Sequence, residues 1–361
     1  MEVLRMSKQF QIKSSIQDYE VNFIDSVEEE LSNTFQDGDY IIVDQKLPEL
    51  YPGLDKLLSK YNRVIRILAE EKTKSYEGVI PFFHELISNG FKRNNRIIAI
   101  GGGITQDVSA FIASILYRGV KWIFFPTTLL AQGDSCIGSK TSINFKEFKN
   151  QVGNFYPPLK IYIDANYLGT LEERDIRSGV GEMAHYFFVA GESEVNFFEN
   201  EYETALNDQS NLDDVIAKSL LIKKSYIEID EFDKKERIVF NYGHTFGHAI
   251  ESITNYGVPH GVAVSFGMDM ANYISYKKGY ISLEMVERGH NIFSKIWEGY
   301  SILDISLENL YKAMEKDKKN ENGKFGLILT KGWGQMFKDL TEPNQTFKEW
   351  MDEYMQKYHR G

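Results

Sequence analysis

Histidine is concentrated in one short stretch of this sequence. His244, His248 and His260, three of the seven histidines in the chain, fall within 17 residues. Side chains four residues apart share one face of a helix, and neutral imidazole is the commonest protein ligand for a divalent transition metal. Residues 257–259, Gly-Val-Pro, predict a turn that can return His260 to the first two. The spacing therefore favours a metal site.

A structural role is the alternative for each of these histidines. One helical histidine is usually a hydrogen-bonded, partly buried side chain, and a pair at this spacing is about as often structural as metal-binding. Three histidines among glycines, which allow close backbone approach, favour the metal. The spacing leaves open which three side chains ligate. A carboxylate from elsewhere in the chain would suit zinc and leave one position for water or substrate.

Length and composition predict a folded protein of two domains. The chain has 361 residues, of which 42% are hydrophobic and 26% charged. It contains no apolar run long enough to predict a transmembrane helix, and residues 1–13 lack the pattern of a signal peptide. The single cysteine, Cys136, excludes a disulfide framework and a cysteine-rich metal site. We expect a cytoplasmic protein with no membrane partner.

The charge balance argues against a nucleic-acid partner. The formal net charge is −11, and no basic stripe with interleaved aromatic residues is present. A small phosphorylated substrate remains compatible with this charge, because it needs only about four or five converging cations.

The pattern of apolar residues changes about half-way along the chain. Short apolar runs at residues 40–44, 64–68, 96–100 and 122–126 alternate with helical spacing at 75–89 and 106–116. Beyond about residue 171, helical spacing dominates. These patterns predict a Rossmann-like parallel α/β domain over residues 1–165 and an all-helical domain over residues 166–361. The expected helices of the second part are 180–190, 212–229, 245–254, 262–278 and a surface helix, fraying at its end, over 347–361.

Several features at the carboxyl edge of the predicted sheet suit a nucleotide. Gly101-Gly102-Gly103 lies between a strand and a helix, where backbone amides favour phosphate, although a tight strand–helix turn is an equal explanation. Asp44 ends one strand and could accept a hydrogen bond from a ribose, and Thr127 and Thr128 follow another. Ligands of open α/β sheets bind at this edge. The polar stretch 71–75 could also be only a solvated loop.

A longer series of motifs carries a family resemblance, from about residue 44 to about residue 329. The matching segments are 101–107, 117–119, 126–132, 134–135, 140–141, 149–150, 177–179 with 182, 241–251, 260–261 and 317–319. In this order they resemble the sugar phosphate cyclase family, and most of all its 3-dehydroquinate synthase branch. The resemblance implies an NAD-binding α/β domain, a helical domain and an active site between the two.

The resemblance also implies a set of residues for each task. Glu182, His244 and His260 would bind Zn²⁺ or Co²⁺, and His248 would act as an acid–base residue instead of a ligand. The NAD contacts would come from Asp44, Glu71, Lys74, Gly102, Gly103, Asp107, Thr127, Thr128 and Lys149.

The resemblance also assigns residues to the substrate. The substrate phosphate would be held by Lys140, Asn150, Asn241, His248 and Lys318. The substrate carboxylate would be held by Arg237 and Lys223, and Asp134 would lie near the metal-bound hydroxyls. Arg118 would reach the partner's site across a homodimer interface. Asp107 could alternatively serve only to stabilise the helix dipole.

The implied reaction uses NAD⁺ as a true catalyst. A secondary alcohol is oxidised transiently, phosphate is eliminated, the hydride is returned, and the opened ring closes by an intramolecular aldol reaction to a carbocycle. A divalent metal would lower the pKa of the alcohol and orient it.

Departures from the family pattern surround the predicted substrate site. His185 stands where Lys is usual, Val262 where Glu is usual, and Gln106 and Ser139 where Gly is common, while Lys235-Glu236 replaces a Gly-Leu pair. A cyclase of another sugar phosphate, such as sedoheptulose 7-phosphate, glucose 6-phosphate or an amino analogue, is therefore an alternative.

Two observations favour an acid substrate. Arg237 suits a carboxylate by bidentate hydrogen bonding, and Asn241 accompanies it. We therefore expect 3-deoxy-arabino-heptulosonate 7-phosphate as the substrate. A metal-dependent polyol dehydrogenase is a second alternative, which would have no use for the lysines at 140, 149 and 318–319. A non-catalytic paralogue is the third.

Overall fold

The computed structural model describes residues 9–146, 148–207 and 212–360. Residues 1–8, within the segment tested for a signal peptide, and Gly361, at the end of the expected tail helix, lie outside the described residues. The chain forms two compact units. Unit 1 comprises Met1–Leu171 and Leu212–Phe232, and unit 2 comprises Glu172–Asn211 and Asp233–Gly361. Within the described ranges, no helix combines the length and the apolar character that crossing a bilayer requires.

Unit 1 contains a seven-stranded sheet in the order β1-β2-β9-β6-β5-β3-β4. All neighbouring pairs are parallel except β1 with β2. The four strands expected from the sequence are confirmed as β3, β4, β5 and β6. The bounds are β1 Gln9–Ile12, β2 Tyr19–Phe23, β3 Tyr40–Asp44, β4 Val64–Ile67, β5 Ile97–Gly101, β6 Trp122–Pro126 and β9 Lys160–Ile163.

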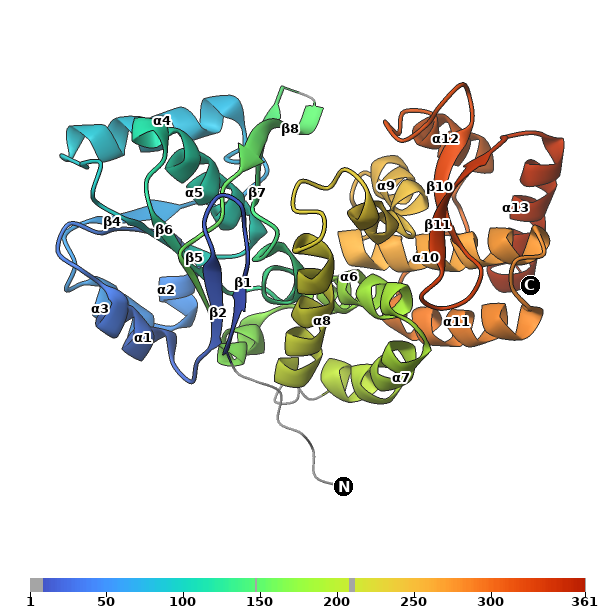
Figure 1. Cartoon of the computed structure of the whole chain (residues 1–361), viewed down its shortest axis with the longest axis horizontal. Coiled ribbons are helices and arrows are strands. Elements are labelled where there is room, and N and C mark those ends of the chain that lie inside the picture. Colours follow the sequence, from blue (N-terminus) through green and yellow to red (C-terminus); the bar gives the residue numbers. More distant parts are fainter. Residues whose placement is uncertain (1–8, 147, 208–211, 361) are drawn as a thin grey trace. The chain divides into compact units, whose positions relative to one another are not determined.

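Helices cover both faces of this sheet, as the strand–helix alternation predicted. In Figure 1, α4 (Tyr76–Ser88) and α5 (Gly103–Ile115) lie on one side of the strands. On the other side lie α1 (Val27–Thr34), α2 (Leu47–Leu50) and α3 (Pro52–Leu58). Alternate residues of each strand face opposite ways, so Ile41 and Val43 of β3 join the core beneath α1–α3. Both faces must be apolar, which is why these strands are continuous hydrophobic runs.

Unit 1 also contains elements that the sequence patterns did not predict. A hairpin follows β6, formed by β7 (Lys140–Phe145) and β8 (Phe148–Phe155), and the segment before it is the π-helix η2 (Ala131–Ser135). Two short 3₁₀ helices are η1 (Leu116–Arg118) and η3 (Ala165–Thr170).

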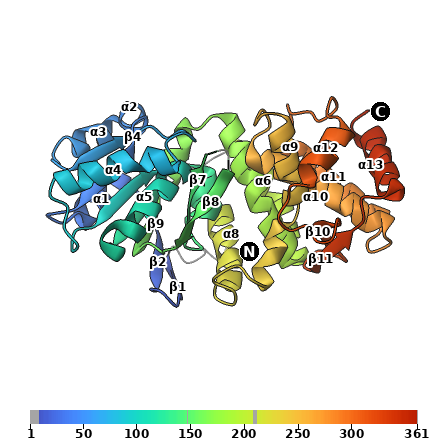
Figure 2. The same ribbon diagram turned by 90° about the horizontal axis from the view of Figure 1, so that it is seen from above.

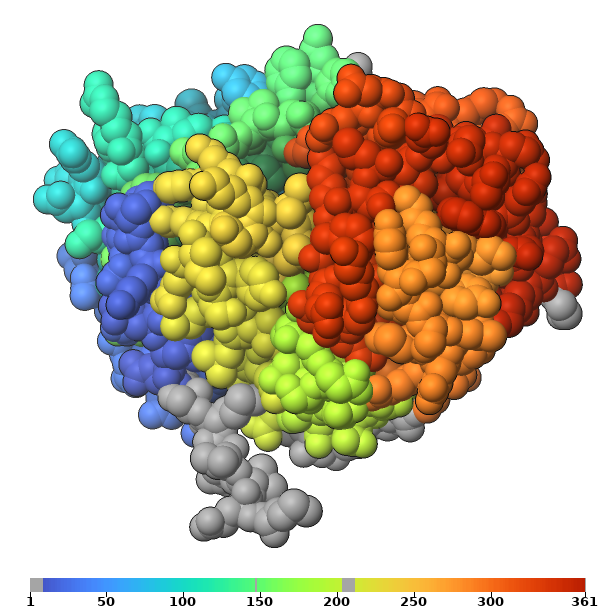
Figure 3. Space-filling model, turned by 45° about the vertical axis from the view of Figure 1, so that its right-hand side comes forward, coloured from blue at the N-terminus to red at the C-terminus, as the bar shows by residue number. Residues whose placement is uncertain are grey.

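Helix α8 (Leu212–Ile227) was expected in the second domain but belongs to unit 1. The backbone amides of Lys13 and Ser15, in the β1–β2 turn, donate to Glu228 and Glu231 just beyond the helix. Farther along, α8 packs against η2, where the Ser219 hydroxyl donates to the Gly133 carbonyl at 2.9 Å. In Figure 3 the yellow surface of α8 lies beside the blue surface of β1 and β2.

Unit 2 is helical apart from one hairpin. Helix α10 (His260–Lys277) packs against the helices around it and against β10 (Figure 2). The other elements are α6 Glu173–Ala190, α7 Glu192–Asn207, η5 Glu236–Asn241, α9 His244–Ile253, α11 Leu283–Ile296, α12 Leu307–Met314, β10 Phe325–Thr330, β11 Met336–Thr341 and α13 Gln345–Tyr358.

The fold class is confirmed, a parallel α/β unit with a helical unit, and one detail differs. The β10–β11 hairpin interrupts the region expected to be all-helical. The expected tail helix is α13, in which Phe347, Met351, Tyr354 and Met355 bury one face and the opposite face is exposed.

Candidate active site

Glycines let three helices of unit 2 approach one another at backbone distance. A Cβ atom on Gly261 of α10 would lie 1.8 Å from the Ser178 carbonyl oxygen of α6, and one on Gly181 would lie 2.2 Å from the Gly261 oxygen. A Cβ on Gly267 would lie 2.0 Å from the oxygen of Gly243, the N-cap of α9. No larger residue fits at these points without separating the helices. The contacts place the beginning of α10 beside α6 and the beginning of α9 beside the middle of α10.

The three predicted metal ligands meet where these helices converge. His244 Nε2 lies 3.5 Å from Glu182 Oε1, and His260 Nε2 lies 3.3 Å from Glu182 Oε2. All three ligand atoms lie within 4.8 Å of one another. Donors of a tetrahedral site with bonds of about 2.1 Å stand about 3.4 Å apart, so the observed spacing suits a zinc-sized ion.

The remaining nitrogens of the two histidines are already engaged. His260 Nδ1 lies 2.9 Å from Glu251 Oε2, and His244 Nδ1 lies 3.2 Å from the Tyr242 carbonyl oxygen. A partner of this kind fixes the ring orientation and the tautomer, and it leaves Nε2 as the ligand atom. Glu251 was not among the residues singled out from the sequence. Its position, three residues after His248 on the same helix, was the available signal.

The side chains of the cluster strongly shift one another's pKa values. Burial alone would raise the pKa of Glu182, but His244 and His260 outweigh burial and hold that pKa well below its usual range. Burial would likewise lower the pKa of His260, yet Glu182 and Glu251 raise it well above its usual range. Glu182 Oε2 is buried and accepts no hydrogen bond from the described residues. One buried carboxylate oxygen and two oriented imidazoles therefore fit a divalent ion.

His248 occupies a different place from the other two histidines of the stretch. Its side chain is exposed, and its ring centre lies 5.5 Å from that of His244 and 5.7 Å from that of His260. A second possible ligand group contains His248, Glu251 and His260. In that group, Glu251 and His260 are close because a hydrogen bond joins Glu251 Oε2 and His260 Nδ1, and this bond orients the imidazole. His248 is thus beside the candidate metal site, with its side chain accessible.

Four further predicted residues belong to unit 2. His185 is 1% exposed, and its Nδ1 lies 3.9 Å from Glu182 Oε1. Arg237 is buried in η5, and Asn241 ends that element, donating to the Ile238 carbonyl at 3.1 Å. Lys318 is exposed.

Lys319, which lies in the 317–319 motif, was given no separate role from the sequence. Its Nζ lies 2.7 Å from Asp317 Oδ2. Burial, followed by repulsion from His244, His260 and then Lys319, lowers the pKa of His248 to about 3.

The predicted cofactor residues gather in unit 1 at the carboxyl ends of the strands. Asp44 ends β3, and the Thr127 amide, just after β6, donates to the Gly101 carbonyl at 3.0 Å. A Cβ on Gly102 would lie 2.7 Å from Thr128 Cγ2, whereas one on Gly103 would meet nothing within 4 Å. A side chain at Gly102 would therefore require the Thr128 side chain to move. The open space at Gly103 leaves its backbone accessible to a ligand.

The other cofactor residues form a polar cluster beside that edge. Lys74 Nζ lies 2.5 Å from Asp107 Oδ2, and Lys149 Nζ lies 3.8 Å from Glu71 Oε1. Burial raises the pKa of Asp107, although Lys74 opposes the shift. The buried Asn144 connects the cluster, because its side chain donates to Glu71 at 2.7 Å and its amide donates to the Lys74 carbonyl. Asn144 was not predicted from the sequence.

The remaining predicted residues of unit 1 lie in two places. Lys223 Nζ lies 2.7 Å from both the carbonyl and Oδ1 of Asp134, which connects α8 with η2. Lys140 and Asn150 are exposed on the β7–β8 hairpin.

The backbone around Arg118 is unusual. Tyr117, Arg118 and Gly119 have φ angles of 51°, 68° and 112°. Consecutive left-handed residues are rare outside functional segments.

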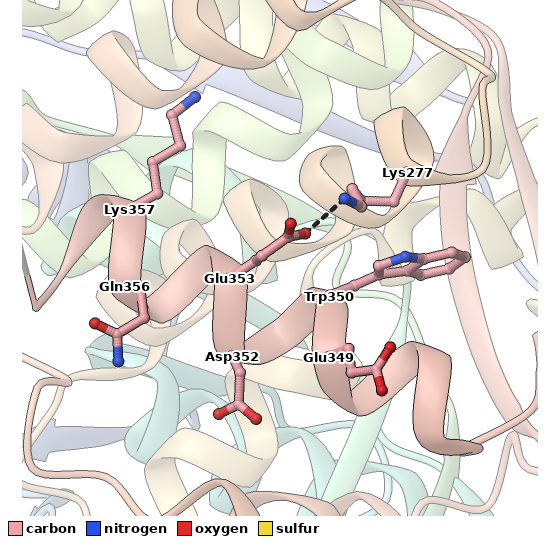
Figure 4. Close-up of a pocket in the computed structure, with 7 residues that line it drawn as sticks. All are labelled: Lys277, Glu349, Trp350, Asp352, Glu353, Gln356 and Lys357. Carbon is pink, nitrogen blue, oxygen red and sulfur yellow. Dashed lines mark hydrogen bonds and ion pairs between the residues drawn. The ribbon is translucent and has the colours of Figure 1, made fainter.

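A surface hollow on unit 2 is separate from all of these residues. It lies over α13 and the end of α10 and has a volume of about 740 Å³ (Figure 4). Its lining is Lys277, Glu349, Trp350, Asp352, Glu353, Gln356 and Lys357. None of them was predicted to do chemistry.

Comparison with known proteins decides the family. Residues 64–178 match the sequence model described as 3-dehydroquinate synthase N-terminal, and residues 179–320 match the one described as 3-dehydroquinate synthase C-terminal. The chain belongs to the 3-dehydroquinate synthase family. A relative named 3-dehydroquinate synthase, from Dictyoglomus thermophilum, is 39% identical over 82% of this chain and 83% of its own length.

Solved structures agree on the fold. A crystal structure of 2-deoxy-scyllo-inosose synthase with carbaglucose-6-phosphate, NAD⁺ and Co²⁺ has a TM-score of 0.85 at 24% identity, covering 97% of this chain and all of its own. The 2-epi-5-epi-valiolone synthase from Streptomyces hygroscopicus, with NAD⁺ and Zn²⁺ bound, has a TM-score of 0.82 at 20% identity, covering 94% of this chain and 97% of its own. At these identities the likeness concerns the fold alone.

Proposed function

We propose that the chain is a 3-dehydroquinate synthase that converts 3-deoxy-arabino-heptulosonate 7-phosphate to 3-dehydroquinate and inorganic phosphate. The observation that carries this proposal is the convergence of Glu182, His244 and His260 in a member of this family. Relatives that align with most of this chain are named 3-dehydroquinate synthase.

Two groups from solution complete the proposed enzyme. A divalent ion held by Glu182, His244 and His260 would supply a Lewis acid that lowers the pKa of a substrate hydroxyl. NAD⁺, held by the residues at the sheet edge of unit 1, would supply reversible hydride acceptance. Two structures of similar fold contain NAD⁺ together with Co²⁺ or Zn²⁺.

The chain's own side chains would bind and orient the acid substrate. Arg237 is a planar donor suited to a carboxylate, and Lys223 adds a second positive charge beside Asp134. Elimination of phosphate needs that group to be held rigidly. We assign this task to Lys140, Asn150, Asn241, His248 and Lys318.

His248 is the side chain best placed to exchange a proton. It is exposed, while the neighbouring imidazoles of His244 and His260 are engaged at Nδ1.

One observation favours a second candidate function, a cyclase for a different sugar phosphate. His185, in place of the usual Lys, is almost fully buried and lies 3.9 Å from Glu182. A buried imidazole presents less positive charge than a lysine, which would suit a substrate with fewer anionic groups.

A homodimer is also proposed, with Arg118 reaching the partner's site. The strained turn that presents the exposed Arg118 supports this role, as do the apolar side chains near it, Ile115 and Tyr117, which are 48% and 39% exposed. If Arg118 acts on the partner, mixing inactive Arg118→Ala and Glu182→Ala subunits restores part of the activity, whereas no recovery rejects the role. The cytoplasmic location stays a prediction.

Phosphate release is the decisive test of the proposed function. Purified protein with NAD⁺ and Zn²⁺ or Co²⁺ is incubated with the acid heptulosonate phosphate, and separately with sedoheptulose 7-phosphate and glucose 6-phosphate. We expect phosphate from the acid substrate with no net NADH. Phosphate from a neutral sugar only would support the second candidate. Stoichiometric NADH without phosphate would reject both in favour of a dehydrogenase.

A further inference from the structure

Side-chain hydrogen bonds connect the π-helix η2 with separate elements of unit 1. Gln132 donates to the carbonyls of Pro126 and Asp164, at the ends of β6 and β9, at 3.0 and 2.9 Å. From α8, Ser219 donates to the Gly133 carbonyl. Wide π-turns are uncommon and often mark functional sites. Here the turn carries Asp134, the partner of Lys223.

Gln106 contributes a two-way contact to the same turn. It lies in the first turns of α5 and is 5% exposed. Its Nε2 donates to the Ser135 carbonyl at 2.6 Å, and its Oε1 accepts from the Ser135 hydroxyl at 2.6 Å. Both polar atoms of the carboxamide are therefore satisfied by the residue next to Asp134.

A glycine at position 106 would make neither contact. The carbonyl and the hydroxyl of Ser135 would then depend on other groups, and one end of η2 would lose its attachment to α5. Because Asp134 is bonded to Lys223 through its carbonyl and its carboxylate, movement of the turn also moves the ammonium group. The attachment thus runs from Gln106 through Ser135 and Asp134 to Lys223.

We propose that Gln106 is a positioning residue that fixes Asp134, and through it the Lys223 ammonium, and thereby sets the affinity for the acid group of the substrate. The assignment of Lys223 to that group rests on the proposed function. The hydrogen bonds of Gln106 do not depend on the proposed function. The experiment can therefore distinguish a failure of this proposal from a failure of the proposed function.

The first measurement needs no substrate. Acylation of Lys223 by a soluble amine reagent is followed by mass spectrometry in the wild type and in Gln106→Met, which keeps the length of the side chain but removes its hydrogen bonds. Lys224, the next residue of α8, is the internal reference. We expect Lys223 in the variant to react about tenfold faster relative to Lys224, in line with the loss of buried hydrogen bonds. An unchanged ratio overturns the proposal.

The second measurement is steady-state phosphate release. We expect Gln106→Met to raise KM for the acid substrate about tenfold, with kcat within about twofold and NAD⁺ affinity unchanged. In a Lys223→Met background the same substitution adds no further increase, because the effect is transmitted through Lys223. Additive effects, or a loss confined to kcat, contradict the proposal.

A matched control is available on the same helix. Ser109 is fully buried, and its hydroxyl has no hydrogen-bond partner among the described residues. Ser109→Ala should change neither the reactivity of Lys223 nor KM, so a similar change there would mean that α5 responds non-specifically. If the wild type releases no phosphate from any substrate, the proposed function fails while the acylation ratio still decides the role of Gln106.

Discussion

The candidate metal site of unit 2 and the polar clusters of unit 1 differ in the groups that surround their carboxylates. In unit 2, Glu182 gathers two imidazoles around it and keeps a buried oxygen without a hydrogen bond. In the polar clusters of unit 1, Asp107 pairs with Lys74 and Asp134 pairs with Lys223. The first arrangement is a set of converging ligand atoms that a divalent ion would complete. The second consists of ion pairs between side chains of the protein.

This difference indicates how each unit depends on its ligand. In unit 2 the ligand atoms converge, and one of them, Glu182 Oε2, accepts no hydrogen bond from the described residues. A divalent ion would bind these atoms together, so metal binding should add to the stability of unit 2. An ion pair inside unit 1 must be partly exchanged when an anionic ligand binds.

Glu182→Ala should have the largest effect. It removes the only carboxylate of the ligand set, so we expect bound zinc to be lost and phosphate release to fall by about a thousandfold or more. Metal content by mass spectrometry and phosphate release are measured on the same preparation. Retention of stoichiometric zinc with normal turnover would reject the ligand assignment, and with it the contrast between the units.

A pair of glycine substitutions compares the two units directly. Gly261→Ala places a methyl group 1.8 Å from the Ser178 oxygen, so we expect a loss of about 2–4 kcal/mol in the free energy of unfolding and a weaker metal site. Gly103→Ala meets nothing within 4 Å, so the unfolding free energy should change by less than about 1 kcal/mol.

NAD⁺ affinity separates the roles of the same two glycines. If the cofactor approaches the backbone at Gly103, the alanine variant should bind NAD⁺ about tenfold more weakly while remaining fully folded. Calorimetric titration and denaturant unfolding give both quantities. Unchanged NAD⁺ affinity in Gly103→Ala would remove this residue from the cofactor site.

Glu251→Gln tests the orientation of His260 and should have a smaller effect. The amide keeps the shape but weakens the hydrogen bond to Nδ1, so we expect zinc affinity to fall about 10- to 100-fold, with activity recovered at saturating zinc. Competition with a zinc chelator measures the affinity. Equal affinities of variant and wild type would show that Glu251 is not the orienting partner.

The dependence of the unfolding free energy on pH should also differ between the units, and this is the smallest of the expected effects. Unit 1 has a single histidine, His84, which is exposed, whereas burial, followed by repulsion from His290, lowers the pKa of His359 in unit 2 to about 4. The unfolded chain therefore binds the proton first as the pH falls below about 6.5. Stability from this group is present above that pH and is lost toward pH 4. Between pH 7 and pH 5 the expected loss is about 1 kcal/mol, reduced by the partial exposure of the ring.

His359→Phe isolates this contribution. The ring contacts Phe266 and Trp297, and its Nε2 lies 3.1 Å from the Tyr354 hydroxyl. Phenylalanine keeps the ring packing and cannot titrate, so its unfolding free energy should depend less on pH between 7 and 5. Identical pH dependence in the two proteins would assign the acid sensitivity to other groups.

Local patterns predicted some elements well and others not at all. Strands β3 to β6 were found because both faces of a parallel sheet are apolar and produce unbroken hydrophobic runs. The β7–β8 hairpin was missed because β8 is mostly exposed and polar, and β7 buries Thr141 and Asn144 together with Ile143, so that neither strand is a continuous apolar run. The sequence also predicted helix α8, but an amphipathic pattern shows only that one face is buried, not which unit covers it.

The sequence by itself determined the residue types, their order and the helical spacing that favoured a metal near His244 and His260. Those are properties of the chain over a few turns, where side-chain geometry repeats regularly. Only the tertiary structure brought Glu182 to those histidines, made Glu251 the partner of His260 and connected Gln106 with Lys223 through Ser135 and Asp134. These relations depend on helix packing at particular glycines and on contacts between distant segments, and no local pattern contains that information.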